Sequence, residues 1–317
     1  MKNTERLLVA SLRRYASLRG YELVEHGDGW IVEIRLGRRS HFVHGYDLGL
    51  NSSSSLRVAN DKAATFEALS RGGVPAVPHR LFMHPRFLGF MSVDGNWRHM
   101  LEAFEEFGRD VVIKDNEGTG GMEMARVRSV AGLELETQRL FGLTRGIALS
   151  PFLEIEQEVR FVLLENTCLA AYTKDRSTVT GDGRSTLAEL ALASVAARQL
   201  DPATIELDGP SLAAVPPAGK TIAVQWRHNL GYGAQARRVD PHDPAQADAA
   251  TLARQAFDRL GLRFASIDVV RSGGGTMVLE ANSGVMLEVM ARGNPDGGVV
   301  VDSIYHRALD LAIEHSR

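Results

Sequence analysis

Residues 264–282, FASIDVVRSGGGTMVLEAN, constrain the fold more than any other part of the chain. Apolar and polar residues alternate on both sides of Gly273–Gly275, which predicts two antiparallel strands joined by a tight turn. With the turn centred in these glycines, Asp268 and Glu280 face each other, and Asn282 shares the face of Glu280. Directly opposed like charges destabilise a strand pair, so we expect something in the protein to compensate.

A hard divalent cation is one candidate for that compensation. Asp, Glu and Asn offer only oxygen ligands, which suit Mg²⁺ better than zinc. The alternative is a solvated hairpin with its polar residues directed outward, and the spacing alone leaves both possibilities open. The metal site becomes the better explanation only if other parts of the chain supply phosphate ligands.

Bulk properties exclude several classes of protein. The chain has 317 residues, 44% of them hydrophobic and 24% charged, which indicates a soluble globular protein of about two domains. A net charge of −3 gives no reason to expect nucleic acid or an anionic membrane as a partner. The single cysteine, Cys168, excludes an intramolecular disulfide and fits a reducing compartment. The N-terminus lacks a signal-peptide core and no stretch approaches ~20 apolar residues, so we expect a cytoplasmic protein.

The pattern of elements predicts a mixed α+β or α/β fold. Helices are expected over residues 5–18, 62–69, 99–107, 187–200, 245–260 and 301–314. Strands are expected over 21–24, 30–36, 41–43, 111–113, 126–127, 147–149, 159–164, 169–172, 221–226, 264–270 and 277–281. Loops are expected at the NSSSS run (51–55), at 175–185 and across the proline-bearing connector 201–219.

The sequence VVIKDNEGTGG, residues 111–121, is the best phosphate-binding candidate. A buried strand ends at Lys114, and a loop with Gly118, Gly120 and Gly121 follows. Glycines let backbone N–H groups approach phosphate closely, and the lysine adds a positive charge. A simple turn would explain the same residues.

Two better-known phosphate motifs are excluded. Gly219–Thr221 is similar to the end of a Walker A loop, but Ala214 replaces its first glycine and Pro216 and Pro217 interrupt it. No complete GxGxxG opens a helix, so a Rossmann site is unsupported. The sequence also lacks an HExxH motif, a nucleophile elbow and a cysteine cluster.

The order of the remaining motifs resembles the ATP-grasp superfamily, from about residue 56 to the end. Four segments carry the resemblance: Asn60–Lys62 with Thr65 and GVPAVPH (73–79), VVIKDNEGTGG (111–121), SPFLEIEQEVRFVLL (150–164), and the hairpin DVV…LEAN. The third is similar to the hinge that holds adenine and ribose, and the fourth to the terminal metal site. The resemblance implies two α+β subdomains that clasp ATP.

Two further motifs narrow the resemblance. GDGRSTLAEL (181–190) and RHNLGYGA (227–234) are similar to the ATP-grasp portion of cyanophycin synthetases and bifunctional glutathione synthetases. The step from Glu158 to Arg160 resembles ribosomal-protein glutamate ligases. The chain departs from these relatives in a short N-terminal segment, in Ser150–Pro151 at the hinge, and in NSGVML after the metal strand.

The resemblance also implies a division of the chain and a set of site residues. A short α/β segment, 1–55, precedes an ATP-grasp core, 56–317, with a lid subdomain over about 105–175 and a metal-binding subdomain over about 176–317. The cofactors are ATP and one or two Mg²⁺ ions, for which Mn²⁺ can substitute. The implied ATP ligands are Lys62, Lys114, Gly118, Gly120, Gly121, Leu153 and Glu158; the metal ligands are Asp268, Glu280 and Asn282; the catalytic residues are Arg160, Lys174, Arg227 and Asn229.

The activity implied by the resemblance is ATP-dependent ligation of a small-molecule carboxylate, an amino acid or peptide, to an amine. An acyl phosphate is the intermediate, ADP and phosphate are released, and the loops 118–121 and 175–185 are expected to close over it. An ATP-grasp kinase and an inactive nucleotide-binding protein are the alternatives, and a homodimer is left open. Because the opposed carboxylates repel without a cation, we also expect Glu280→Gln to leave the apoprotein as stable or slightly more stable.

Overall fold

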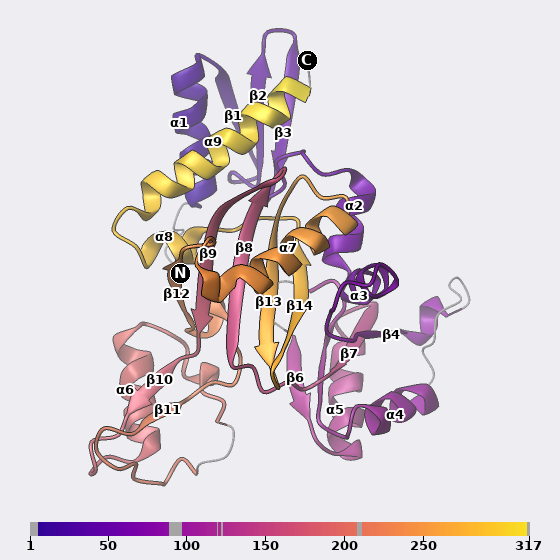
Figure 1. The fold of residues 1–317 in the computed structure, drawn as a ribbon, viewed down its shortest axis with the longest axis vertical. Helices are drawn as coiled ribbons and strands as arrows, with labels where there is room; N and C mark the ends of the chain where they lie inside the picture. The colour runs from indigo at the N-terminus through magenta and orange to yellow at the C-terminus, as the bar shows by residue number, and fades with distance from the viewer. Residues whose placement is uncertain (1–5, 89–96, 119, 122, 208–210, 316–317) are drawn as a thin grey trace.

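A computed structural model describes residues 6–88, 97–118, 120–121, 123–207 and 211–315. The described chain mixes helices with four antiparallel sheets, as the pattern of elements predicted. Figure 1 shows these sheets as separate units arranged around a central one. Within these residues, no helix combines the length and the apolar character needed to cross a membrane.

The N-terminal unit consists of α1 (Leu7–Arg19) and the sheet β1 (Glu22–His26), β2 (Ile31–Leu36) and β3 (Arg39–His44). Gly20 ends α1 in the left-handed region, at φ 68°. The C-terminal helix α9 (Gly297–His315) lies beside α1 (Figure 1). Buried residues of both ends, among them Leu8, Ile34 and Tyr305, share one hydrophobic core, so this unit joins the two ends of the chain.

Two short helices lead from this unit into the rest of the chain. The expected loop at 51–55 is wrong, because α2 (Ser53–Asn60) begins there. Ser52 caps it by accepting a hydrogen bond from the backbone of Ser55, a role that serine favours, so the serine run is a helix start. The next helix, α3 (Lys62–Arg71), begins as predicted, with Asp61 Oδ1 accepting from Ala64 N at 2.8 Å.

A four-stranded sheet forms the next unit, with strand order β4-β7-β5-β6. Its strands are β4 (Arg80–Met83), β5 (Val111–Asp115), β6 (Met124–Val127) and β7 (Gly146–Pro151). The 3-10 turn η1 (Pro85–Phe87) follows β4, and the helices are α4 (Trp97–Glu106) and α5 (Val130–Phe141), of which α5 was not anticipated. Val111 and Ile113 anchor β5 in the core of this unit, and the strand carries Lys114 to its edge.

The central sheet has the strand order β12-β9-β8-β13-β14. Its strands are β8 (Gln157–Leu164), β9 (Thr167–Asp175), β12 (Gln235–Val239), β13 (Phe264–Ser272) and β14 (Gly275–Asn282). The helix α7 (Ala247–Arg259), preceded by η4 (Pro244–Gln246), packs on one face, as Figure 1 shows in orange. The N-terminal unit with α8 (Glu288–Arg292) and α9 packs on the other. Neither β12 nor α8 was anticipated.

Sheet membership divides the chain differently from the proposed subdomain ranges. The strand β4 precedes residue 105 and belongs to the four-stranded sheet, whereas β8 and β9, which precede residue 175, belong to the central sheet. By this criterion the chain passes from the smaller sheet to the central one between β7 and β8. The hinge motif 150–164 therefore spans the passage between the two sheets.

A small satellite lies to one side of the central sheet (Figure 1, lower left). It contains β10 (Thr178–Thr180), β11 (Thr221–Ala223), α6 (Leu187–Ala197) and η2 (Pro202–Thr204). The expected loop 175–185 thus includes a strand, and the expected strand 221–226 is shorter. A Cβ on Gly181 would lie 2.3 Å from the carbonyl of Pro217, so the GDG turn fits closely against the prolines of the connector.

Candidate active site

Two cavities meet between the sheets. The first has a volume of about 890 Å³ and contains most of the residues implied as ATP ligands. Its lining includes Lys62, Lys114, Gly118, Gly121, Leu153, Glu158, Lys174, Arg227, Asn229 and Glu280. The second has a volume of about 1470 Å³ and is lined by Gly120, Arg160 and Asn282 together with Trp30, Tyr46 and Met286. Gly121, Lys174, Asn229 and Glu280 line both, so the cavities join at these residues.

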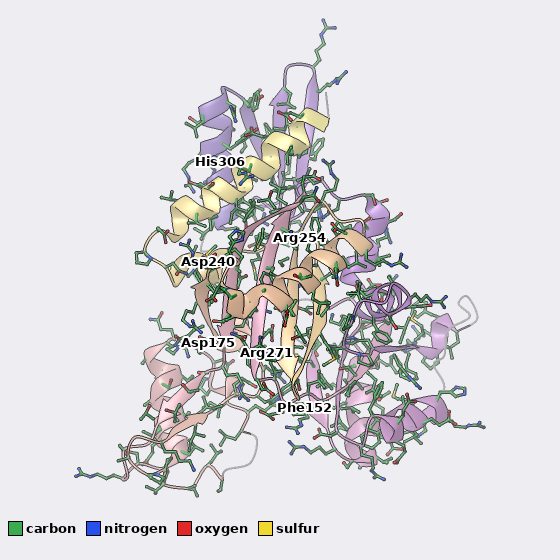
Figure 2. The ribbon with its side chains drawn as sticks, in the orientation of Figure 1. Phe152, Asp175, Asp240, Arg254, Arg271 and His306 are labelled. Atoms are coloured by element: carbon green, nitrogen blue, oxygen red, sulfur yellow. The ribbon has the colours of Figure 1, made fainter. Side chains whose placement is uncertain are left out.

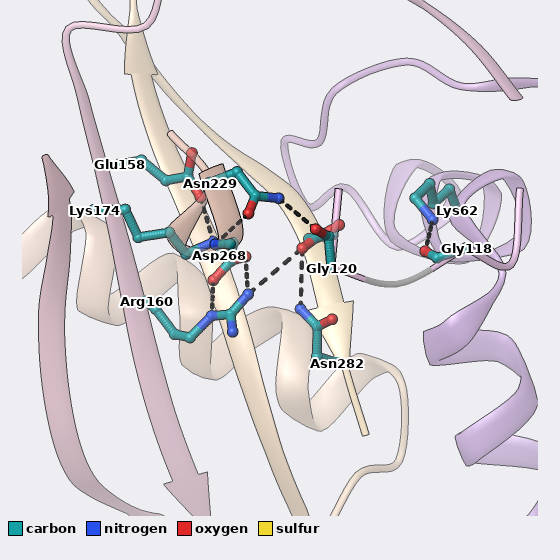
Figure 3. A network of polar contacts seen from close by, with 11 residues as sticks. Lys62, Gly118, Gly120, Glu158, Arg160, Lys174, Asn229, Asp268 and Asn282 are labelled. Atoms are coloured by element: carbon teal, nitrogen blue, oxygen red, sulfur yellow. Dashed lines mark hydrogen bonds and ion pairs between the residues drawn. The ribbon is translucent and has the colours of Figure 1, made fainter. Parts of the chain in front are cut away.

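Two lysines from different units lie at the first cavity. Lys62, at the start of α3, donates to the carbonyls of Gly118 at 2.6 Å and Asn116 at 3.3 Å, and Figure 3 shows the first of these bonds. Lys114, on β5, is only 8% exposed, and no hydrogen bond or ion pair joins its ammonium to another described residue. Burial, with the charge of Lys62, lowers the pKa of Lys114 to about 8.

Among the described residues no acid pairs directly with Lys114, although the charges of Glu280 and Glu158 attract its ammonium. His79 is buried beside it, and its Nδ1 bonds to the carbonyl of Val77 at 2.9 Å. Burial and the charge of Lys114 hold the pKa of His79 well below its usual range, so the ring is neutral. A buried ammonium without a paired acid is costly, and an anionic ligand in the cavity would remove that cost.

A second charged group, the cluster of Asp268, Arg160, Lys174 and Glu158, lies on the central sheet (Figure 3). Asp268 is fully buried; Oδ1 accepts from Arg160 Nε at 2.6 Å, and Oδ2 accepts from Arg160 Nη2 and Lys174 Nζ, both at 2.6 Å. Burial alone would raise the pKa of Asp268, but Arg160 and Lys174 hold it well below its usual range. Lys174 also donates to Glu158.

The predicted register of the hairpin is confirmed, but the predicted unscreened repulsion between Asp268 and Glu280 is wrong. Asp268 pairs with Glu280 across the hairpin, and Asn282 Nδ2 donates to Glu280 Oε1 at 3.2 Å. However, Arg160 on β8 is the register partner of Asp268 on its other side, and its Nη2 lies 3.5 Å from Glu280 Oε1. The protein therefore neutralises Asp268 with its own cations, and the two carboxylates do not face each other unscreened.

Glu158 lies in a buried environment on the central sheet. Its side chain is 4% exposed and lines the first cavity, beside the end of the hinge. Burial raises its pKa to about 7, and the ammonium of Lys174 opposes that rise. The carboxylate is thus held by Lys174 at the floor of the cavity.

The RHNLGYGA motif lies against the glycine-rich loop. Asn229 Nδ2 donates to the carbonyl of Gly120 at 2.8 Å, and its Oδ1 accepts from Gly231 N at 2.7 Å (Figure 3). A Cβ on Gly121 would lie 1.7 Å from Asn229 Nδ2. The 3-10 turn η3 (Leu230–Tyr232) follows directly. Asn229 therefore fixes the position of the loop on which Gly120 and Gly121 lie.

Arg227 is tied to the neighbouring units. Its Nη2 donates to the carbonyl of Met124 at 2.9 Å and pairs with Glu206 at 2.9 Å, and its guanidinium lies between the rings of Trp226 and Tyr232. Its Nε is buried without a hydrogen-bond partner among the described residues. The residue connects the satellite to β6 beside the first cavity.

Aromatic residues of this site were not anticipated. The rings of Phe152 and Trp226 meet at 5.7 Å in an edge-to-face contact at the first cavity, and Figure 2 labels Phe152 near the base of the central sheet. Trp30 and Tyr46 line the second cavity. The position of Trp226 directly before Arg227 was an available signal, whereas Trp30 and Tyr46 lie in turns whose placement depends on the tertiary fold.

The metal ligands implied by the resemblance were tested on their donor atoms. No group of three or more His, Cys, Asp or Glu side chains placed to hold a metal occurs within the described ranges. Glu280 is 29% exposed and reaches both cavities, and Asn282 lies beside it, so these two oxygen donors fit a hard cation. Both oxygens of Asp268 are already bonded to Arg160 and Lys174.

Comparison with solved structures identifies the fold. The chain is similar to a bifunctional glutathione synthetase from Pasteurella multocida, with a TM-score of 0.53 and 16% identity over 96% of this chain and 44% of that one. It is also similar to the D-alanine–D-alanine ligase from Bacillus anthracis, with a TM-score of 0.53 and 11% identity over 84% of this chain and 72% of that one. The same ligase complexed with ATP gives a TM-score of 0.50.

These structures define an ATP-grasp fold for the chain, which confirms the predicted fold class. The chain spans less than half the length of the glutathione synthetase. No family model and no curated protein matches the sequence itself. At these identities the likeness concerns the fold, and the chemistry must be argued from the site.

Proposed function

We propose that this protein is a ligase that uses ATP and Mg²⁺ to activate a carboxylate and join it to an amine. The observation that carries the proposal is the buried ammonium of Lys114, which no described acid pairs with directly and which lines the first cavity. A second cavity joins the first at Gly121, Lys174, Asn229 and Glu280. This arrangement suits a nucleotide in one cavity and a phosphoryl acceptor in the other.

In the proposed complex the nucleotide lies in the first cavity with its phosphates toward the two lysines. Lys62 and Lys114 supply positive charge for the phosphates, and Gly118, Gly120 and Gly121 supply a close backbone. Leu153 lies on the hinge and offers an apolar contact for the base. Glu158, at the floor of the same cavity, offers a carboxyl group for the ribose hydroxyls.

Glu280 and Asn282 would hold a magnesium ion at the junction of the cavities, and Asp268 would add an oxygen only if Arg160 or Lys174 released it. When bound, the ion supplies neutralising charge to the phosphates. Arg160 and Lys174 already lie at that junction with low exposure, at 12% and 7% of their side chains. Cations in such a place orient a carboxylate and offset its repulsion from an anionic phosphate.

The reaction then follows from these positions. The carboxylate oxygen attacks the γ-phosphorus, ADP leaves, and an acyl phosphate forms. An amine attacks the acyl carbon and releases phosphate. Water must be excluded while the acyl phosphate exists, because it would hydrolyse this intermediate. Gly120 and Gly121, next to Asn229, line the second cavity at the junction and are suited to this role.

An ATP-consumption screen against amino acids and dipeptides, with mass spectrometry of the products, tests the proposal. We expect ADP, phosphate and an amide product. AMP as the stoichiometric product would contradict the proposed chemistry, and a stable phosphorylated product made equally well without amines would indicate a kinase. Lys114→Met is the negative control, because it removes the ammonium and keeps the approximate volume of the side chain.

A further inference from the structure

We propose that the second cavity binds an amino acid or short peptide whose bulky apolar side chain lies against Trp30 and Met286. This inference rests on the proposed function, because it assigns the cavity beside the phosphates to a reactant. About 520 Å³ of this cavity has room for the centre of a water molecule, which accommodates a molecule of dipeptide size. The charges and apolar surfaces of its lining restrict which molecule that is.

The carboxylate end of the reactant belongs at the junction of the cavities. Arg160 and Lys174 line the second cavity there, and their surroundings exclude most water. Both cations already pair with Asp268, and Lys174 also pairs with Glu158, so a carboxylate of the reactant would share these cations with the acids of the protein. The side chain of the reactant then extends toward residues that line the second cavity only.

Those residues include two large apolar side chains that water reaches. Trp30, in the turn before β2, is 51% exposed, and Met286, after β14, is 41% exposed. They come from opposite ends of the chain and line the same cavity, beside the partly buried Leu56 and Leu230. Exposed apolar surface gathered in a cavity marks a ligand-binding surface, because covering it is favourable.

Trp30 and Tyr46, the aromatic side chains on this side of the second cavity, are held in place by contacts with neighbouring residues. The guanidinium of Arg6 lies 4.8 Å from the centre of the Trp30 ring, and the His44 ring meets Trp30 edge to face at 6.0 Å. Arg6 donates to the carbonyl of Gly45 at 2.9 Å, and the hydroxyl of Tyr46 donates to Glu288 at 2.6 Å. A wall fixed before binding loses little further side-chain entropy when a ligand covers it.

The charge of this wall argues against an acidic side chain. Apart from His44 and Tyr46, Asp47 is the only ionisable group among the described residues that line the second cavity away from Arg160, Lys174 and Glu280, and the guanidinium of Arg6 lies over the Trp30 ring. Asp47 Oδ1 accepts from Gly49 N at 2.9 Å. A second carboxylate on the reactant would be repelled by Asp47, whereas an amino group would be attracted to it. The wall therefore selects apolar over acidic amino acids.

The test measures binding and turnover with defined probes. Binding is measured by thermal shift with Mg²⁺ and a non-hydrolysable ATP analogue, and turnover by ADP release with Mg²⁺ and ATP. The probes are leucine, methionine, phenylalanine, glycine, aspartate, glutamate and the dipeptide Leu-Leu. We expect the apolar probes to bind at least about tenfold more tightly than glycine or the acids. Trp30→Ala and Met286→Ala should each raise the apparent KM for the apolar probes about tenfold and leave the KM for ATP unchanged.

Phe42→Ala is the matched control. Phe42 lies on β3 of the same sheet, is 56% exposed and lines neither cavity, so its removal should leave both KM values unchanged. Stronger responses to glutamate, aspartate or glycine, no response to any apolar probe, or unchanged KM values in both variants would overturn the inference. In each of these cases a retained Mg²⁺·ATP shift leaves the proposed function standing, whereas loss of that shift in the wild-type protein would overturn the proposed function itself.

Discussion

The lysines at the first cavity and the charged cluster around Asp268 are neighbours in the protein, but their charges are satisfied differently. Within the part of the chain that the structure describes, Lys114 is buried without a directly paired acid, and Lys62 donates hydrogen bonds to backbone carbonyls. Asp268 is buried with both of its oxygens bonded to cations. In the first arrangement the ammonium of Lys114 can pair with an anionic ligand. In the second, the charges of the side chains already balance, so the cluster is stable without a ligand.

This contrast indicates that the lysines of the first cavity bind the ligand, whereas the cluster around Asp268 positions other side chains. A site that must receive phosphate gains affinity from cations whose burial is not yet compensated. A cluster whose charges are balanced gains rigidity, and it holds Arg160 and Lys174 at the junction of the cavities. We expect substitutions in the first region to affect ligand binding and substitutions in the second to affect stability.

The largest expected effect is on nucleotide binding. Lys114→Met should abolish most of the thermal stabilisation by Mg²⁺·ATP and lower turnover by orders of magnitude, because the phosphates lose a desolvated cation. The apoprotein should be at least as stable as the wild type, because the variant no longer buries an unpaired charge. Lys220→Ala, at an exposed position of the satellite, is the control and should change neither quantity. A full ATP shift in Lys114→Met would remove this lysine from the site.

The second prediction concerns the stability of the cluster. Asp268→Asn should lower the free energy of unfolding by about 3 kcal/mol, because Arg160 and Lys174 lose a buried counter-charge. Asp302→Asn removes a similar two-bond contact to Arg14 at the surface and should cost less than about 1 kcal/mol. Urea denaturation of both variants gives the comparison, and equal losses would show that the buried cluster stabilises the protein no more than the surface pair does.

Glu280→Gln sharpens the same contrast. Glu280 is partly exposed and lies 3.5 Å from Arg160, so its neutralisation should change apoprotein stability by no more than about 0.5 kcal/mol. The earlier expectation of a gain from reduced repulsion no longer applies, because Arg160 already screens the pair. Binding of Mn²⁺ in the presence of ATP, followed by electron paramagnetic resonance, should weaken strongly in this variant. Unchanged Mn²⁺ affinity would exclude Glu280 as a metal ligand.

The pH dependence of nucleotide affinity gives a smaller effect. The pKa of Lys114 is about 8 in the free protein, so the ammonium is charged below this pH and neutral above it. Bound phosphate favours the charged form, so Mg²⁺·ATP affinity should fall roughly tenfold between pH 7.5 and 9.5. Isothermal titration calorimetry measures it, and Lys114→Arg, which stays charged, should remove the dependence. A flat profile in the wild type would contradict the assignment.

The smallest expected effect separates two neighbouring glycines. Both Gly120 and Gly121 have positive φ, at 70° and 65°, so alanine strains the backbone at either position. Only at Gly121 would the added carbon also meet Asn229 Nδ2, at 1.7 Å, whereas nothing lies within 4 Å at Gly120. Gly121→Ala should therefore lower turnover several-fold more than Gly120→Ala. Equal rates for the two variants would show that Asn229 does not position the loop.

The sequence predicted those parts of the fold that depend on local pattern. The alternation around Gly273–Gly275 predicted the register of Asp268 against Glu280, and the helix predicted over 62–69 begins at the same residue as α3. Lys114 lies at the end of its strand, as predicted. These features follow from the periodicity of strands and from helix capping, which neighbouring residues determine.

The parts that the sequence did not predict depend on contacts between distant segments. Arg160 lies 108 positions from Asp268 along the chain, and their pairing arises only when β8 and β13 become neighbours. Trp30 was read as part of a strand, and its role in the second cavity depends on residues such as Met286 at the other end of the chain. The roles of the site residues and the subdomain boundaries stay predictions.

The central claim, activation of a carboxylate by ATP, is tested most directly with an isotope. The protein is incubated with Mg²⁺·ATP and an apolar amino acid and dipeptide mixture labelled with ¹⁸O in the carboxylates, and the phosphate is examined by ³¹P nuclear magnetic resonance. We predict ADP together with inorganic phosphate that carries one ¹⁸O atom, because the oxygen bonded to the acyl carbon stays with phosphorus when the amine attacks. Unlabelled phosphate, or label in AMP, would contradict the account.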